Sequence, residues 1–99
     1  MMKSNNKYKK ILGVISKTIN QWDPYDLIAS GAPTDEFESE IEKVATYFPQ
    51  IHSSSDAVFA ISEVFSKSFE PKDFLPEKCT EIGNDLYNRF IEAGLVENA

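Results

Sequence analysis

The sequence is poor in cysteine, and its only thiol is that of Cys79. A single cysteine excludes a disulfide within the chain and leaves a cysteine-based zinc site without its ligands. One thiol in a small domain is typical of a reducing compartment. No apolar run approaches the ~18 residues that span a bilayer, and the polar N-terminal stretch lacks the apolar segment of a signal peptide. We therefore expect a cytoplasmic protein with no membrane partner.

Catalytic signatures are also lacking. His52 is the only histidine, and no glycine-flanked serine elbow or Cys-Gly signature accompanies it, so a histidine-dependent triad has no support. No phosphate-binding glycine loop, zinc pattern, EF-hand loop or dinucleotide fingerprint occurs. We therefore predict no catalytic residue, no metal site and no cofactor, and expect that the protein is not an enzyme.

Positive charge is scarce, because 10 basic residues face 16 acidic ones and leave a net charge of −6. Phosphate contacts need a basic face, so we expect no nucleic-acid partner. An acidic surface favours basic partners over anionic ones. The sequence is compatible with a monomer or a weak homodimer.

Apolar residues recur at helical spacing in four stretches, which predict helices over residues 8–22, 34–48, 54–68 and 76–93. A short helix over residues 24–29 is predicted after a Trp-Asp-Pro turn, because Pro24 cannot continue the first helix. Residues 1–99 form one domain, with residues 1–6 expected to fray. The predicted fold is all-α, a compact bundle of four main helices plus one short helix.

Local features refine this prediction. Asp23 is expected to cap the short helix, and Ser53, with Asp56 three residues later, is expected to cap the third long helix. Gly83 lies on the apolar face of the last helix, where glycine costs about 1 kcal/mol relative to alanine, so we expect a close helix crossing there. Phe59 lies opposite its own helix's apolar stripe, which leaves open whether it is covered by neighbours or marks an interface.

An acidic segment follows the short helix, with five carboxylates and one nearby base, Lys43. On a helix over residues 34–48, Glu36 and Glu40 would share one face, as would Glu38 and Glu42. A run of like charges is usually a solvated face, and it is also suited to a basic protein partner. Alternatively, such carboxylates could hold Mg²⁺ or Mn²⁺ if a second helix supplied further oxygen ligands.

The segment Trp22-Asp23-Pro24-Tyr25 places two aromatic residues beside a carboxylate at a helix junction. Exposed tryptophan and tyrosine are frequent interface anchors. The spacing also fits a structural role, in which Trp22 completes the apolar stripe of the first helix. The candidate partner-binding residues are Trp22, Asp23, Tyr25, Asp35, Glu36, Glu38, Glu40 and Glu42.

Two motifs together carry a resemblance. Trp22-Asp23-Pro24, followed by the run from Gly31 to Ile41 (GAPTDEFESEI), resembles a family of small uncharacterised bacterial proteins that occurs chiefly in bacilli. The resemblance implies an all-helical, cytoplasmic bacterial protein and implies no catalytic activity. Similar small acidic proteins serve as immunity partners beside polymorphic toxins.

We therefore predict a non-enzymatic protein-binding module whose acidic helix faces a basic protein, with immunity against a nuclease-type toxin as one concrete form. The alternative is a metal-dependent hydrolase of nucleotides or related phosphates. It would use Asp35, Glu36 and Glu40 together with acids from a neighbouring helix or a second subunit.

Overall fold

The computed structural model describes residues 2–32 and 35–96, and the side chains from residue 6 onward within those ranges. Four α-helices account for most of it: α1 (Met2–Trp22), α2 (Glu38–Thr46), α3 (Ser54–Ser68) and α4 (Thr80–Glu92). The described ranges contain no strand. The predicted all-α bundle is therefore confirmed.

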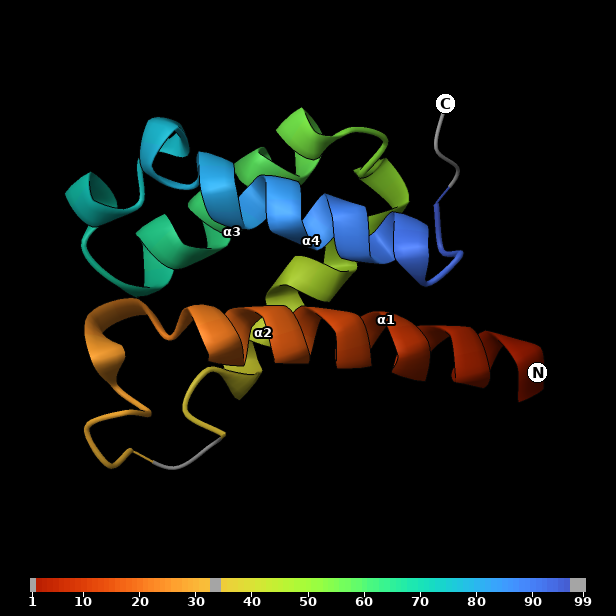
Figure 1. The fold of residues 1–99 in the computed structure, drawn as a ribbon, viewed down its shortest axis with the longest axis horizontal. Coiled ribbons are helices and arrows are strands. Elements are labelled where there is room, and N and C mark those ends of the chain that lie inside the picture. The colour runs from red at the N-terminus through yellow and green to blue at the C-terminus, as the bar shows by residue number, and fades with distance from the viewer. Residues whose placement is uncertain (1, 33–34, 97–99) are drawn as a thin grey trace.

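The helices form a closed arrangement in which each one packs against two others. α3 packs most extensively against α4, and α1 contacts both α2 and α4, while α2 also contacts α3. Figure 1 shows α1 running along one side of the molecule with α4 opposite it. The Cα radius of gyration is 13.1 Å, close to the ~13 Å of a compact domain of this length.

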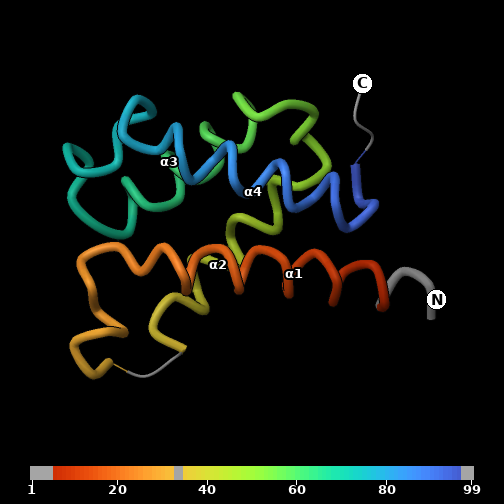
Figure 2. Tube along the Cα trace, in the orientation of Figure 1, coloured from red at the N-terminus to blue at the C-terminus, as the bar shows by residue number. Residues whose placement is uncertain are grey.

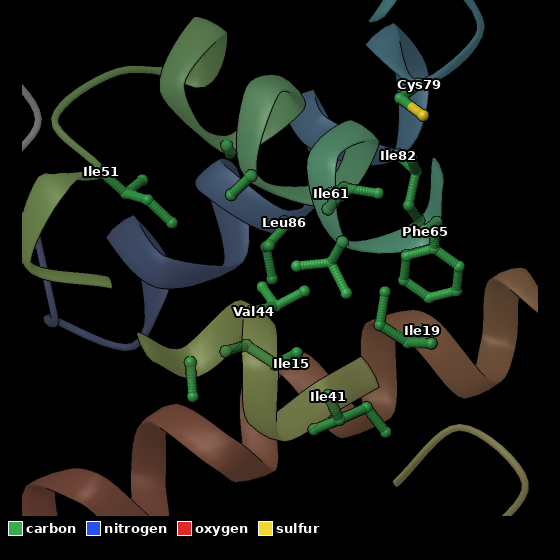
Figure 3. Packing of buried hydrophobic residues seen from close by; sticks show 14 of the residues in the cluster. Ile15, Ile19, Ile41, Val44, Ile51, Ile61, Phe65, Cys79, Ile82 and Leu86 are labelled. Carbon is green, nitrogen blue, oxygen red and sulfur yellow. The ribbon is translucent and has the colours of Figure 1, made fainter. Parts of the chain in front are cut away.

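Isoleucines and aromatic residues from all four helices fill the centre. Ile15 and Ile19 of α1 meet Ile61 and Phe65 of α3, and Leu86 approaches them from α4 (Figure 3). All five side chains are fully removed from solvent. Because each helix contributes one apolar stripe to the same core, none of them can leave the bundle without exposing it.

Four short 3₁₀ turns connect these helices, and each has a proline in its first turn, where the missing N–H is not needed. They are η1 (Pro24–Asp26), η2 (Phe48–Gln50), η3 (Pro71–Asp73) and η4 (Pro76–Lys78). The short helix predicted over residues 24–29 is thus one 3₁₀ turn followed by further turns. In Figure 2 the corner after α1 and the segment between α3 and α4 lie at the same end of the molecule.

Two predicted helix starts are wrong. α2 begins at Glu38 because Phe37, with φ −102° and ψ 16°, has a non-helical backbone, and the residues before it form a turn. The predicted start at residue 34 lies outside the described residues. α4 begins at Thr80 because Cys79, with φ −103° and ψ 7°, separates it from the turn η4.

Other local predictions are confirmed. Ser53 caps α3, and its hydroxyl oxygen accepts a hydrogen bond from the backbone N–H of Asp56 at 3.3 Å. The Asp56 carboxylate in turn accepts one from the N–H of His52 at 2.8 Å. α3 also has the predicted bounds. After α4, Gly94 takes a φ of 75°, the left-handed conformation that often ends a helix.

Residues 2–6, which we expected to fray, continue α1, and how far this end opens in solution stays a prediction. Within the described ranges, none of the helices combines the length and the apolarity that crossing a membrane requires.

Candidate functional site

The corner that follows α1 has an unusual backbone. Asp23, Tyr25 and Asp26 all have positive φ angles, of 48°, 66° and 54°. A residue with a Cβ pays roughly 1–2 kcal/mol in this left-handed region. Three such residues within four positions therefore need compensating contacts, and these contacts involve two of the residues singled out in the sequence.

The carboxylate of Asp23 stabilises the corner from within. It accepts hydrogen bonds from the backbone N–H groups of Ile28 and Ala29, both at 2.9 Å. The predicted cap on the Pro24 turn is absent, because Asp23 is left-handed rather than extended and its side chain reaches further along the chain. Asp23 therefore has a structural role, because both of its carboxylate oxygens accept hydrogen bonds within the corner.

Tyr25 fastens the corner to the segment after α3. Its hydroxyl donates a hydrogen bond to the Asp73 carboxylate at 2.7 Å. Its ring stands edge-on to those of Phe69 and Phe74, with centroids 5.7 and 5.6 Å away. The hydrogen bond to Asp73 raises the pKa of Tyr25 above its ordinary value, and desolvation and the negative charges of Asp73 and Glu70 act in the same direction. The side chain nevertheless keeps 48% of its surface exposed.

Trp22 has mainly a packing role. Its ring stands edge-on to Phe65 at 5.2 Å and to Phe74 at 5.8 Å. The side chain is half-buried against the core, which is the structural role that its spacing in the sequence allowed. Phe74 is 3% exposed and lies beneath this aromatic group.

The acidic segment is divided between a turn and a helix. Asp35 and Glu36 lie in the turn before α2, so the predicted shared helix face of Glu36 and Glu40 does not exist. Glu40 also differs from its neighbours, because only 9% of its surface is exposed. The remaining carboxylates are all exposed, and we refer to them as the acidic face: Asp35, Glu36, Glu38 and Glu42.

No base in the described residues neutralises the acidic face. The two ion pairs among the described residues join Lys67 to Glu63 within α3, at 3.4 Å, and Arg89 to Asp85 within α4, at 3.2 Å. Neither pair includes a residue of the acidic face. The carboxylates of the acidic face therefore present their charge directly to solvent.

The fold brings the start of the acidic segment close to the Tyr25 corner. Phe37 is fully buried, and its ring centroid lies 6.2 Å from that of Phe69. The Phe69 ring also contacts the Tyr25 ring, and their centroids are 5.7 Å apart. Phe69, which directly follows α3, thus links two candidate segments that are separated in the sequence. Figure 1 shows the corner after α1 and the start of the acidic segment near the same end of the molecule, while α2 continues toward its middle.

A shallow hollow between the corner and the end of α3 was not predicted. It has a volume of about 560 Å³ and is lined by Tyr25, Ser68, Phe69, Glu70 and Asp73. Only Tyr25 was singled out in the sequence. The other residues are the last residue of α3 and three residues of the segment after it. Their proximity to Tyr25 has no local signature, because it depends on how α1 packs relative to α3.

Within residues 2–32 and 35–96, no three His, Cys, Asp or Glu side chains lie close enough together to hold a metal ion. His52 is exposed, and its carbonyl accepts a hydrogen bond from the Tyr87 hydroxyl at 3.0 Å. Burial raises the pKa of the Cys79 thiol to about 11, which disfavours the nucleophilic thiolate.

Comparisons of the chain with protein-family models, with curated proteins and with solved structures found no match. The resemblance of the Trp-Asp-Pro and Ala-Pro-x-Asp-Glu motifs to a bacterial family therefore stays a prediction.

Proposed function

We propose that this protein is a non-enzymatic binding module whose acidic face contacts a basic protein. The observation that carries the proposal is the set of four exposed carboxylates within residues 35–42, which have no ion pair among the described residues. Like charges at this density repel one another slightly, and a basic partner would relieve that repulsion.

The charge of the whole chain favours the same kind of partner. The net charge of −6 creates an attractive field for a cationic surface and a repulsive one for nucleic acids and anionic membranes. Complementary charge chiefly raises the rate of association, and this rate falls as salt screens the field. We therefore expect an association that is fast at low salt.

The partner class can be narrowed by its chemistry. A nuclease carries a basic surface because it must contact phosphates. An acidic module that covers this surface would inhibit the nuclease by occupying its substrate site. An immunity-like role of this kind needs no catalytic group in the module, in keeping with the proposal that the protein is not an enzyme.

The proposal is tested with two variants that change the net charge equally. The first replaces Glu36, Glu38 and Glu42 with glutamine, and the control replaces Glu77, Glu81 and Glu92, which are exposed elsewhere. A partner captured from host lysate is purified, and its association rate with each variant is measured at low and moderate salt.

We expect the wild type and the control to bind the partner at similar rates, while the acidic-face variant binds much more slowly and loses most of its salt dependence. Binding that is independent of salt and equal in both variants would show that the acidic face is not the contact surface.

A further inference from the structure

The hollow beside Tyr25 combines aromatic walls with an acidic rim. The Tyr25 and Phe69 rings meet at an interplanar angle of 74°, and Phe74 lies beneath them with its centroid 5.9 Å from that of Phe69. Two further lining residues, Glu70 and Asp73, supply carboxylates. An aromatic face next to carboxylates is an environment that attracts an organic cation.

The hydrogen bond from the Tyr25 hydroxyl to the Asp73 carboxylate, 2.7 Å long, places a negative group at the edge of the hollow. The pKa of Tyr25 is raised first by the hydrogen bond to Asp73, and the charges of Asp73 and Glu70 act in the same direction. Lys67 pairs with Glu63 on α3, and the exposed Lys72 is not among the residues that line the hollow.

A guanidinium group fits these features better than an ammonium group does. It is planar and weakly hydrated, it stacks on aromatic rings, and it forms paired hydrogen bonds with carboxylates. The aliphatic stem of the same side chain could lie along Phe69, which is half-buried. Lysine has a compact, strongly hydrated charge and lacks this planar match.

We propose that the hollow formed by Tyr25, Phe69, Glu70 and Asp73 receives an arginine side chain of the basic partner. This inference rests on the proposed function and adds a specific contact to it. The acidic face supplies long-range attraction, and the hollow, which lies at the same end of the molecule, supplies the short-range contact that selects arginine.

The test uses the full ¹⁵N-labelled chain and the blocked tripeptide acetyl-Gly-Arg-Gly-amide as the probe. The matched peptide replaces arginine with citrulline, which has nearly the same shape without the charge. We expect the arginine peptide to shift the amide signals of Ser68, Phe69 and Glu70 saturably and to lower the measured pKa of Tyr25. The citrulline peptide should do neither, because it brings no positive charge to the hollow.

Substitution then assigns the contact. Glu70→Gln should weaken the affinity for the arginine peptide about two- to fivefold, which is the size expected for one exposed charge contact. Glu77→Gln is the control. Like Glu70, Glu77 is an exposed glutamate next to a proline, but it does not line the hollow. Equal affinity in the two variants, or an equal response to lysine and arginine peptides, would overturn the arginine assignment.

The pattern of shifted signals separates this inference from the proposed function. Shifts confined to residues 35–42 would overturn the arginine hollow and leave the acidic face in place. Shifts confined to the hollow would support the arginine contact. If the acidic-face variant nevertheless bound the partner as fast as the wild type, the acidic face would be overturned and the arginine contact would stand. No saturable shift at either place would overturn the hollow, and the association-rate experiment would then decide the acidic face alone.

Discussion

Gly83 of α4 lies directly against the backbone of Val58 in α3. A Cβ built on Gly83 would stand 2.7 Å from the Val58 Cα atom and 2.8 Å from its nitrogen. Real Cβ atoms do not approach backbone atoms this closely, so the two helices can cross here only because position 83 has no side chain. The close crossing expected from the sequence is confirmed, and it sets the packing of the most extensive helix pair in the molecule.

Gly83→Ala should therefore destabilise the protein by about 1–2 kcal/mol, because overpacking against a backbone outweighs alanine's higher helix propensity. The matched control is Gly13→Ala in α1, where an added Cβ would meet nothing within 4 Å. That variant should gain up to about 1 kcal/mol. Urea unfolding of the two variants measures both changes, and a stabilised Gly83→Ala protein would contradict the close crossing.

Ser53→Ala should cost about 1 kcal/mol of unfolding free energy, because it leaves the N–H of Asp56 without its capping oxygen. Ser55→Ala is the control, because Ser55 is exposed in the first turn of the same helix and no hydrogen bond of its side chain is found among the described residues. The pair is compared by thermal unfolding. Similar melting temperatures in the two variants would show that the cap adds nothing to stability.

Asp73→Asn should lower the pKa of Tyr25 toward 10.0, because the substitution removes the charged hydrogen-bond acceptor that favours the neutral phenol. The titration is followed by NMR of labelled tyrosine, with Tyr25→Phe to assign the signal. An unchanged Tyr25 titration in Asp73→Asn would contradict the hydrogen bond.

The same shift predicts how stability varies at high pH. The folded state favours protonated Tyr25, so its contribution is fully present below the unfolded pKa of about 10 and is lost as the pH rises through the higher folded value. The wild type should therefore lose more stability in this range than Tyr25→Phe does. Denaturant unfolding at a series of alkaline pH values checks this, and parallel curves for the two proteins would refute it.

Cys79 should react slowly with a thiol reagent in the native protein. Its side chain is fully buried, and burial raises the pKa to about 11, so little thiolate is present or accessible at neutral pH. In denaturant the reaction should become fast, because the pKa returns toward 9.0 and the sulfur is exposed. Rapid native labelling at neutral pH, at the rate seen in denaturant, would place Cys79 outside the core.

The raised pKa of Cys79 also has a consequence for stability. The folded state favours the protonated thiol, so this contribution is present below pH 9.0 and is lost as the pH rises toward about 11. Cys79→Ala should remove that part of the alkaline instability while it costs stability at neutral pH through the cavity it leaves. Calorimetry of both proteins at neutral and alkaline pH measures the two effects.

The helices themselves could be predicted because their cause is local. Apolar residues at helical spacing indicate an amphipathic helix whatever packs against it, and α3 has the bounds that its apolar stripe and its Ser53 cap predict. The starts of α2 and α4 could not be predicted in the same way. At both places a buried residue, Phe37 or Cys79, leaves the helical conformation just before the helix begins.

The features of the candidate site also separate into those that depend on local sequence and those that depend on tertiary packing. The sequence by itself determined the excess of carboxylates, the lack of catalytic motifs and the turn at Pro24, because each depends only on composition or on neighbouring residues. Only the tertiary structure decided that Glu40 is buried while its neighbours are exposed, and that Phe59 keeps 55% of its surface in solvent.

The contact between Tyr25 and Asp73 is the clearest case, because it joins residues 48 positions apart. Neither residue has a local pattern that points to the other. Their meeting follows from the packing of α1 on the core, which brings the corner after Trp22 against the aromatic residues at the end of α3. The sequence determined which charged and aromatic groups the protein has, and long-range packing of the helices decided which of them form a binding surface.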